Sequence, residues 1–481
     1  MRLCFRRTKR KTLYAVALFS NMMFCLRYWP FSWPFASSGV SRGLLGPMED
    51  VLRAQQANRG ELSDAENFDH SYDFKYEGLF NDMDSLRTFG SFSCSQLFMK
   101  TVVINKTAVE AKNNYLKSRI PHDAAFHSLA ENCTKFTSER YFKYNVTQEE
   151  LDFPLAYGIY MYKSVRQVEL LLRTIYRPHN VYCIHIDRKA SLHVHKSMRA
   201  IAKCFDNVFV ASRLARVTWC SIEVVRAELY CLSDLLKRPE KWKYYLNLSG
   251  QEFPLKTNLE IVQILKEYHG LSDVMSSSLR TSPERQKFKY FINKGEVVNS
   301  TLPHTLPKPF AGPIFKGELH VALSRQFVGF ILYTKVGQTW FTWLNESLCP
   351  DEYFYQTLSR LPGVPGVLGR NVSGPLAELT RAKIWQGSVS GDCQGKLVRQ
   401  ICVYSWRDLP YLATRPQLFA NKFHADYDSV VLECLSELIQ NRTNNPIKLN
   451  LPFYRNFSTF RSWESVTNQK NWILRDESKL P

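Results

Sequence analysis

The stretch FPLAYGIYMYKSVRQVELLLRTIYRPHNVYCIHID, residues 153–187, predicts a strand, a helix and a second strand in succession. Residues 153–162 and 180–187 are apolar runs of strand length. Between them, apolar side chains recur at the three- and four-residue spacing of one helix face, namely Val165, Val168, Leu171, Leu172 and Ile175. Two strands joined by a helix in this way are expected to lie parallel in one sheet.

The alternation of strands and helices continues along the chain, at residues 207–212, 221–238, 243–250 and 258–269. Thr257 and Glu260 have the spacing of a capping box, which marks the start of the last of these helices. We therefore expect an α/β fold with a largely parallel central sheet. Its ligands would bind beyond the carboxyl ends of the strands, where Asp187 lies. Residues 290–435 mix short strands with helices and give no clear internal boundary.

Composition limits the class of protein. The 481 residues include 24 Tyr, 31 Phe and 10 Trp, which indicates a globular body with a large core rather than a disordered chain. The formal charge of +19 is compatible with nucleic acid, an anionic membrane or a phosphorylated substrate. The sequence has no zinc-finger, RRM or KH signature, so we expect no nucleic-acid partner.

The N-terminus has the pattern of a signal anchor. Residues 12–26 form an uncharged apolar run, and the cations before it are Arg2, Arg6, Arg7, Lys9, Arg10 and Lys11. We expect a cytosolic tail at 1–12, a transmembrane segment at 13–33 and a polar stem at 34–92. The run of 15 residues is short for a membrane span, so a signal peptide cleaved near residues 36–38 is the alternative. In both cases the remaining chain would lie outside the cytosol.

Two counts support an extracytosolic compartment. Glycosylation sequons occur at Asn105, Asn132, Asn145, Asn247, Asn299, Asn345, Asn371, Asn441 and Asn456. Ten cysteines follow the apolar run, an even number that is scattered along the chain rather than clustered in close pairs. This distribution fits disulfide bonds better than zinc.

No metal site is predicted. The Asp-x-Asp strings at 82–84 and 426–428 follow no buried strand of the α/β half, where a metal-binding acid pair would need to sit. His193 and His195 are interpreted as loop residues beside the string DRKAS.

Six strings along residues 90–440 resemble one enzyme family, in the order VYCIHID, CFDNVFVASRL, NLSGQEFPLKTNLEIV, CPDEYFYQTLSRLPGVPG, VRQICVY and LFANKF. They are similar to the core 2 type β-1,6-N-acetylglucosaminyltransferases of glycosyltransferase family 14, which are single-pass type II Golgi membrane proteins. The resemblance implies a disulfide-stabilised GT-A-like catalytic domain at 93–440, followed by a C-terminal extension at 441–481. It also implies inverting transfer of GlcNAc from UDP-GlcNAc to a 6-hydroxyl, without a metal ion.

The string CPDEYFYQTL places Glu352 where the family has its catalytic base. An inverting displacement requires one carboxylate to accept the proton of the attacking hydroxyl. The residues alone have another explanation, because acids that follow Pro350 also favour the start of a helix. Two family cations correspond to Arg399 and Lys422, which would stabilise the leaving diphosphate in place of a metal ion.

The resemblance assigns donor binding to the ends of the first two strands and to one tryptophan. The residues that it places near the uridine are Asp187, Arg188, Lys189, Tyr160, Met161, Tyr162 and Trp219. For Asp187 the alternative is a capped strand end, and for Trp219 the alternative is a place in the core.

The acceptor side is less similar to the family. Arg285 matches an acceptor-binding arginine and Trp385 matches an acceptor-side tryptophan. The position of a family lysine falls on Ser282, and no acid can be placed. Two larger residues, Glu318 and Leu319, stand where the family has small ones.

The resemblance also implies four disulfides, which are Cys94–Cys434, Cys133–Cys204, Cys183–Cys231 and Cys393–Cys402. The last of these would fix the segment around Arg399. Cys220 and Cys349 are left over, and they are either free or joined to each other. Asn247 lies in a predicted buried strand, so we expect its sequon to be unused.

The main functional hypothesis is a Golgi β-1,6-GlcNAc-transferase that takes a UDP-sugar donor and an O-glycan or glycoprotein acceptor. The alternatives are a related transferase that moves another sugar, such as xylose, onto protein, and an inactive luminal glycan-binding member. The sequence leaves a homo-oligomer open.

Overall fold

In the computed structural model, the residues described are 92–99, 104–119, 121–141, 145–277, 282–367, 370–371, 379–387 and 391–458. The chain divides into two compact units, Met1–Asp69 and His70–Pro481, and all described residues belong to the second. The predicted tail at 1–12 and transmembrane segment at 13–33 lie outside the described residues, as does nearly all of the predicted stem. Among the described helices, none combines the length and the apolar character that a membrane crossing requires.

A five-stranded sheet forms the centre of the fold, in the order β3 (Val208–Val210), β2 (Val181–Ile186), β1 (Leu155–Met161), β4 (Tyr244–Ser249) and β9 (Ala322–Ser324). The first four strands are mutually parallel and β9 is antiparallel to β4. Every residue of β2 is buried, as expected for a strand with both faces covered. The prediction of an α/β fold with a largely parallel central sheet is confirmed.

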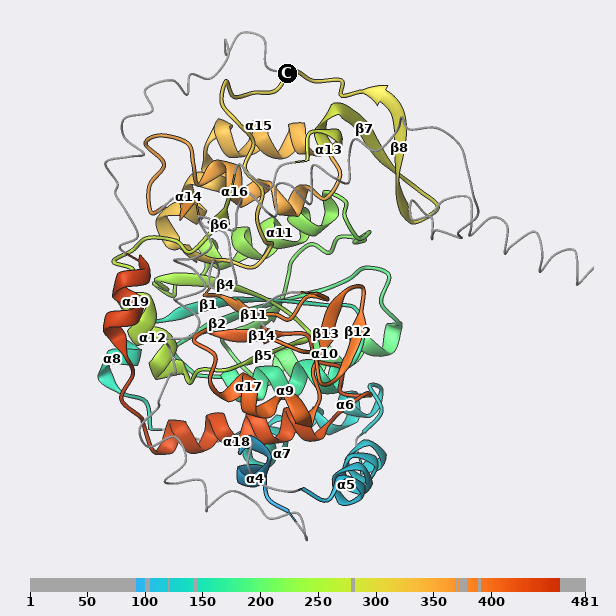
Figure 1. Cartoon of the computed structure of the whole chain (residues 1–481), viewed down its shortest axis with the longest axis vertical. Coiled ribbons are helices and arrows are strands. Elements are labelled where there is room, and N and C mark those ends of the chain that lie inside the picture. Colours follow the sequence, from blue (N-terminus) through green and yellow to red (C-terminus); the bar gives the residue numbers. More distant parts are fainter. Residues whose placement is uncertain are drawn as a thin grey trace, which may run out of the picture. The chain divides into compact units, whose positions relative to one another are not determined.

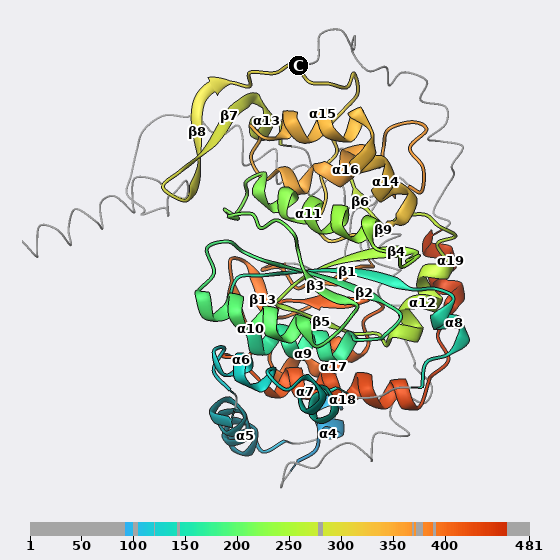
Figure 2. The ribbon, with the colours of Figure 1, turned by 180° about the vertical axis from the view of Figure 1, so that it is seen from behind.

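Helices cover both faces of this sheet (Figures 1 and 2). One face carries α9 (Val165–Ile175), α10 (Leu192–Lys203), α17 (Leu409–Ala413) and α18 (Val430–Asn444). The other carries α11 (Glu223–Lys237), α14 (Arg325–Tyr333), α15 (Lys335–Leu344) and α16 (Phe354–Leu358). The remaining helices are α4 (Cys94–Phe98), α5 (Lys106–Arg119), α6 (Ala125–Leu129), α7 (Cys133–Arg140), α8 (Gln148–Leu151), α12 (Asn258–Lys266), α13 (Glu284–Lys287), α19 (Leu451–Ser458) and the short turns η2 (Pro350–Glu352) and η3 (Trp406–Asp408).

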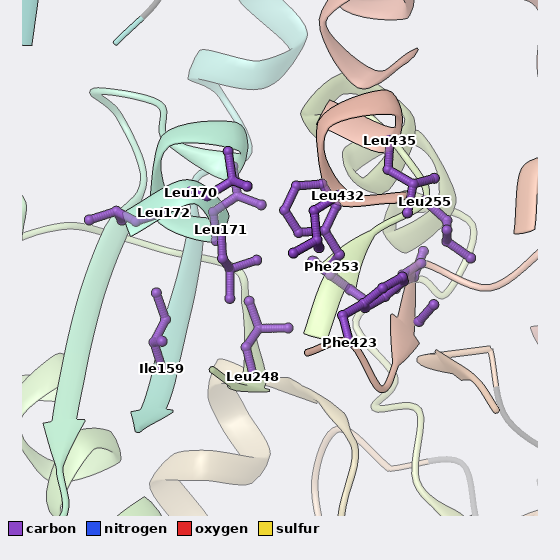
Figure 3. Close-up of a cluster of buried hydrophobic side chains, with 14 of the residues drawn as sticks. Ile159, Leu170, Leu171, Leu172, Leu248, Phe253, Leu255, Phe423, Leu432 and Leu435 are labelled. Carbon is purple, nitrogen blue, oxygen red and sulfur yellow. The ribbon is translucent and has the colours of Figure 1, made fainter. Parts of the chain in front are cut away.

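Two apolar cores hold these layers together. In the first, side chains of α9 and α18 meet those of the sheet, and Figure 3 shows Leu171, Leu248 and Leu432 among them. The second core lies under α11, α14 and α15, and it includes the fully buried Trp340. The sheet is therefore packed against helices on both faces.

The capping box predicted at Thr257 and Glu260 is present at the start of α12.

Short strands beyond the central sheet supply most of the second half of the fold. A three-stranded sheet joins β11 (Arg381–Ala382), β14 (Phe419–Asn421) and β5 (Glu252–Pro254). Two hairpins pair β12 (Lys396–Val398) with β13 (Ile401–Val403), and β7 (Phe288–Asn293) with β8 (Glu296–Pro303), and β10 (Arg370–Asn371) pairs with β6 (Met275–Ser276). Helix α18 continues through residue 440, where we placed the end of the catalytic domain, to Asn444.

Five disulfides link these elements. The structure joins the four pairs implied by the resemblance, which are Cys94–Cys434, Cys133–Cys204, Cys183–Cys231 and Cys393–Cys402. It also joins Cys220 to Cys349, the second of the two alternatives for these residues. Asn247 is buried in β4, where its amide donates to Glu228 at 2.7 Å, so its sequon is inaccessible in the folded protein.

Candidate active site

Glu352 ends the short turn η2, between Cys349 and helix α16. Cys349 holds this turn against the segment at Cys220, because the two residues share a disulfide and the Cys349 amide donates to the Cys220 carbonyl oxygen at 2.9 Å. Two cations approach the Glu352 carboxylate, with Arg285 Nη1 at 2.5 Å and Lys316 Nζ at 3.0 Å from Oε2. The turn begins with Pro350, as the helix-start explanation expects. That explanation alone gives no reason for two cations on one partly exposed carboxylate.

Asp351, the neighbour of Glu352, has a different environment. Its Oδ1 is buried and has no hydrogen-bond partner among the described residues. Burial, followed by the nearby charge of Glu352, raises the pKa of Asp351 to about 7. The two adjacent acids therefore have distinct surroundings, since the Glu352 carboxylate contacts two cations whereas Asp351 Oδ1 is buried without a hydrogen-bond partner among the described residues.

Arg399 lies at the turn of the β12–β13 hairpin, where it and Gln400 both have positive φ angles. The Cys393–Cys402 disulfide, a pairing that the resemblance implied, closes this hairpin. Lys422 follows β14, and its amide donates to the Cys402 carbonyl oxygen at 3.3 Å. Burial, followed by the charge of Arg399, lowers the pKa of Lys422. The two cations predicted for the diphosphate are thus close enough to interact.

Trp219 connects these cations to Glu352. Its side chain is 71% exposed, so the alternative that Trp219 belongs to the core is wrong. The Arg399 guanidinium lies over the Trp219 ring at 5.5 Å from its centre. The next residue, Cys220, is bonded to Cys349, three residues before Glu352. One short segment therefore contacts both the predicted cation site and the turn of the predicted base.

A cavity of about 980 Å³ opens at the carboxyl ends of β1, β2 and β4. Four of the predicted donor residues line it, which are Tyr160, Met161, Tyr162 and Asp187. This is the edge where a parallel sheet is expected to bind its ligand. Among the described residues, Arg188, Lys189, Trp219, Arg399, Lys422 and Glu352 are not part of its lining.

The surroundings of Asp187 fit a capped strand end, and its role in uridine binding stays a prediction. Asp187 lines the cavity, and its Oδ1 also accepts from the Lys189 amide at 3.0 Å, as in a capped strand end. The Lys189 ammonium lies 2.7 Å from Asp187 Oδ2 and over the Tyr162 ring. Arg188 is held by its backbone, which donates to the Ala215 carbonyl oxygen at 2.9 Å.

The two predicted acceptor residues lie on different elements. Arg285 is on α13 and contacts Glu352 directly. Trp385 is 38% exposed and pairs through a β-bridge with Ile401 of the hairpin that carries Arg399. Arg285 therefore belongs to the surroundings of the predicted base, and Trp385 to those of the predicted cations.

Sequence reasoning missed Glu228 of α11, which lines the cavity. Its carboxyl group accepts from the Asn247 amide at 2.7 Å and from the Tyr355 hydroxyl, so it links the cavity to α16. Burial raises the pKa of Glu228 to about 7. Glu228 is one of three acids in the pattern of 221–238, with Glu223 and Asp234, so its sequence signal is weak, although it falls on the buried face of that helix.

A buried charge network lies between the cavity and β11. Glu252 lines the cavity, and its carboxylate meets Arg381 Nε at 2.7 Å and His320 Nε2 at 2.8 Å. Burial alone would raise the pKa of Glu252, but Arg381 and His320 together lower it to about 2. Beside this pair, the Lys383 ammonium lies 3.1 Å from Glu318 Oε2. The charge of Glu318, which stands where the family has a small residue, is thus balanced by Lys383.

We expect Arg381→Met to lower the free energy of unfolding by about 3 kcal/mol, since it leaves the Glu252 carboxylate buried without its main cation. Denaturant unfolding of the purified protein measures this value. Arg455→Met is the matched control, because the Arg455 guanidinium is exposed where it pairs with Glu267 and its loss should cost much less. Equal losses in the two variants would contradict the role assigned to Arg381.

No group of three or more His, Cys, Asp or Glu side chains in the described part of the chain could hold a metal ion. Asp428 instead accepts from the Trp406 and Val431 amides at the start of α18, and residues 82–84 lie outside the described part. The interpretation of His193 and His195 as loop residues is wrong, because both lie in the first turn of α10. The Ser191 side chain caps that helix by accepting from the Val194 amide, so the helix begins directly after the string DRKAS.

Comparison with known proteins gives a consistent result. The sequence profile of the Core-2/I-branching enzymes matches residues 155–412. The chain is 35% identical over 334 residues to a Homo sapiens beta-1,3-galactosyl-O-glycosyl-glycoprotein beta-1,6-N-acetylglucosaminyltransferase, which covers 67% of this chain and 78% of the relative. It is 35% identical to the Homo sapiens protein numbered 3 in that series (67% and 77% covered) and 34% identical to the Mus musculus protein numbered 4 (67% and 74% covered).

Proposed function

The chain belongs to the Core-2/I-branching enzyme family and is a glycosyltransferase, and on this premise we propose that it moves GlcNAc from UDP-GlcNAc to a 6-hydroxyl of an O-glycan. The relatives named above carry this activity in their names. The observation that carries the proposal is the position of Glu352 on a turn that the Cys220–Cys349 disulfide ties to Trp219, because the Arg399 guanidinium lies over the Trp219 ring. If the base and the cations are held by the same segment, the base can act on the attacking hydroxyl while the cations stabilise the leaving diphosphate.

The proposed reaction is one in-line displacement at the anomeric carbon of the donor. The acceptor oxygen forms a bond to that carbon, and the bond from the carbon to the β-phosphate oxygen breaks. The UDP group leaves with the electron pair of that bond. Glu352 accepts the proton that the acceptor hydroxyl loses, so atoms and charge balance without a further reactant.

In the proposed mechanism, side chains rather than a metal ion supply positive charge for the leaving diphosphate. Arg399 and Lys422 carry the positive charge that a divalent cation supplies in other transferases. Trp219 and the Cys393–Cys402 disulfide hold the guanidinium of Arg399 in place before the reaction begins. In this proposal the uridine binds at the cavity edge, beside Asp187 and Tyr160.

The proposal includes a Golgi location, with a single-pass type II anchor and a luminal catalytic domain. The basic and apolar pattern of residues 1–33 supports the anchor. Five disulfides in the described residues support an oxidising compartment.

The test is an assay of the full chain, purified in detergent from a eukaryotic secretory host, with UDP-GlcNAc and O-glycans that carry a β-1,3-linked galactose. We expect a β-1,6-linked GlcNAc in the product by linkage analysis, and a rate in EDTA within about twofold of the rate without it. A metal-dependent transferase assayed beside it shows that the EDTA is effective.

Three results would contradict parts of this proposal. A rate that falls by more than about tenfold in EDTA would exclude the metal-free mechanism. Transfer from UDP-xylose to protein serine, with none from UDP-GlcNAc, would identify the chain as the related transferase. Absence of transfer from either donor to every acceptor would identify an inactive member of the family.

A further inference from the structure

Lys316 contacts the predicted base, although no sequence pattern assigns it a role. Its ammonium group lies 3.0 Å from Glu352 Oε2, the same oxygen that Arg285 Nη1 approaches at 2.5 Å. Both cations thus approach Oε2 of the carboxylate, and within the described residues no hydrogen bond reaches Oε1.

The backbone of Lys316 is fixed relative to the turn of Glu352. Lys316 and Ser277 exchange two backbone hydrogen bonds, at 3.0 and 2.9 Å. The amide of the next residue, Gly317, donates to the carbonyl oxygen of Glu352 itself at 2.9 Å. A Cβ atom at Gly317 would overlap the carbonyl oxygen of Met275, so the close approach of these segments requires glycine. The Cα of Lys316 is therefore held at a fixed position relative to Glu352.

The backbone of Arg285 is bonded to the segment that leads into the turn of Glu352. Its carbonyl oxygen accepts from the Leu348 amide at 3.0 Å, four residues before Glu352. The two cations come from separate segments, and each segment is bonded through its backbone to the region around Glu352. The fold therefore places both side chains within reach of the same oxygen.

Among the acids near Lys316, Glu352 is the one that pairs with it. The nearest alternative acid on its own segment is Glu318, which is paired with Lys383 at 3.1 Å. Burial would raise the pKa of Glu318, but Lys383 and His320 lower it to about 2, with a smaller contribution from Lys316. Glu318 is therefore already compensated, and the closest ion pair of Lys316 is with the predicted base.

We propose that Lys316 is a positioning residue for the transfer reaction, which together with Arg285 holds Glu352 by Oε2 so that Oε1 receives the acceptor proton. This inference rests on the proposed function. A carboxylate held at one oxygen cannot rotate away from the acceptor hydroxyl, and this orientation favours the reacting geometry. After Oε1 is protonated, Oε2 remains an acceptor for both cations, so their contacts persist through the reaction.

The experiment compares Lys316→Met, Lys316→Arg and the control Lys289→Met in the full chain, with kcat and both KM values measured for UDP-GlcNAc and an O-glycan acceptor. Lys289 is a matched control, because its ammonium also pairs with one carboxylate, Glu346, at 2.8 Å, and it does not contact Glu352. We expect Lys316→Met to lower kcat about tenfold while both KM values stay within about twofold. Lys316→Arg should recover most of the rate, and Lys289→Met should behave as the unaltered chain.

Three outcomes would overturn the inference, namely an unchanged kcat in Lys316→Met, a loss confined to the acceptor KM, and no recovery in Lys316→Arg. Thermal unfolding is measured for each variant, and Lys316→Gln replaces Lys316→Met if the latter unfolds before the assay temperature. If the unaltered chain transfers no GlcNAc, the proposed function fails and this inference fails with it. If it transfers GlcNAc and the Lys316 variants match it, only the positioning role is refuted.

Discussion

Replacing Glu352 by Gln should lower the rate of GlcNAc transfer about a thousandfold. The amide keeps the size of the side chain but cannot accept the hydroxyl proton, and general-base catalysis commonly contributes factors of this order. Donor binding should change little, since the contacts of Glu352 in the structure are to Arg285 and Lys316 rather than to the cavity. Initial rates at saturating donor and acceptor measure the first effect, and calorimetric titration with UDP measures the second.

Glu284→Gln is the control for Glu352→Gln. Glu284 lies on α13 beside Arg285, and its side chain is 66% exposed in a pair with Lys287. Its loss should change the rate by less than about twofold, because an exposed pair contributes little. A Glu352→Gln variant that retains more than a tenth of the normal rate would remove Glu352 from the role of base.

The second large effect is expected from the two cations assigned to the diphosphate. Arg399→Met and Lys422→Met should each lower kcat about a hundredfold, and the double variant should lose about a thousandfold or more. The reason is that negative charge builds on the β-phosphate as the bond to the sugar breaks, and these cations are already held in position. Rate measurements on the three variants, together with UDP affinity by calorimetry, measure the loss.

Lys396→Met is the matched control for this pair. Lys396 lies on β12 of the same hairpin, but its ammonium faces the Tyr427 ring at 4.2 Å. It should leave both the rate and the UDP affinity within about twofold of normal. If Arg399→Met and Lys422→Met behave like Lys396→Met, the diphosphate must be bound elsewhere in the molecule.

The central sheet was predictable because its sequence pattern is local. The strands at β1, β2 and β4 are continuous apolar runs, and α9 between the first two has its buried residues at regular helical spacing. The position of Asp187 at the carboxyl end of β2 follows from the same pattern. The cavity at this edge was therefore expected from the sequence alone.

The surroundings of Glu352 were less predictable, because they depend on residues far apart in the chain. Lys316 reaches the carboxylate from a segment outside the named helices and strands. The sequence comparison instead placed a family lysine at the position of Ser282. The exposure of Trp219 was likewise hidden, since an indole is as common in a core as on a binding surface. The strands β5, β11 and β14 contain only two or three residues each, which is too few for a periodic pattern.

The disulfide between Cys94 and Cys434 joins residues 340 positions apart, near the two ends of the described fold. During translation Cys94 is synthesised long before Cys434, and eight other cysteines lie between them in the sequence. The thiol of Cys94 must therefore stay reduced, or exchange out of temporary pairings, while nearly all of the catalytic body is synthesised. This disulfide can therefore close only after translation has passed Cys434 in α18.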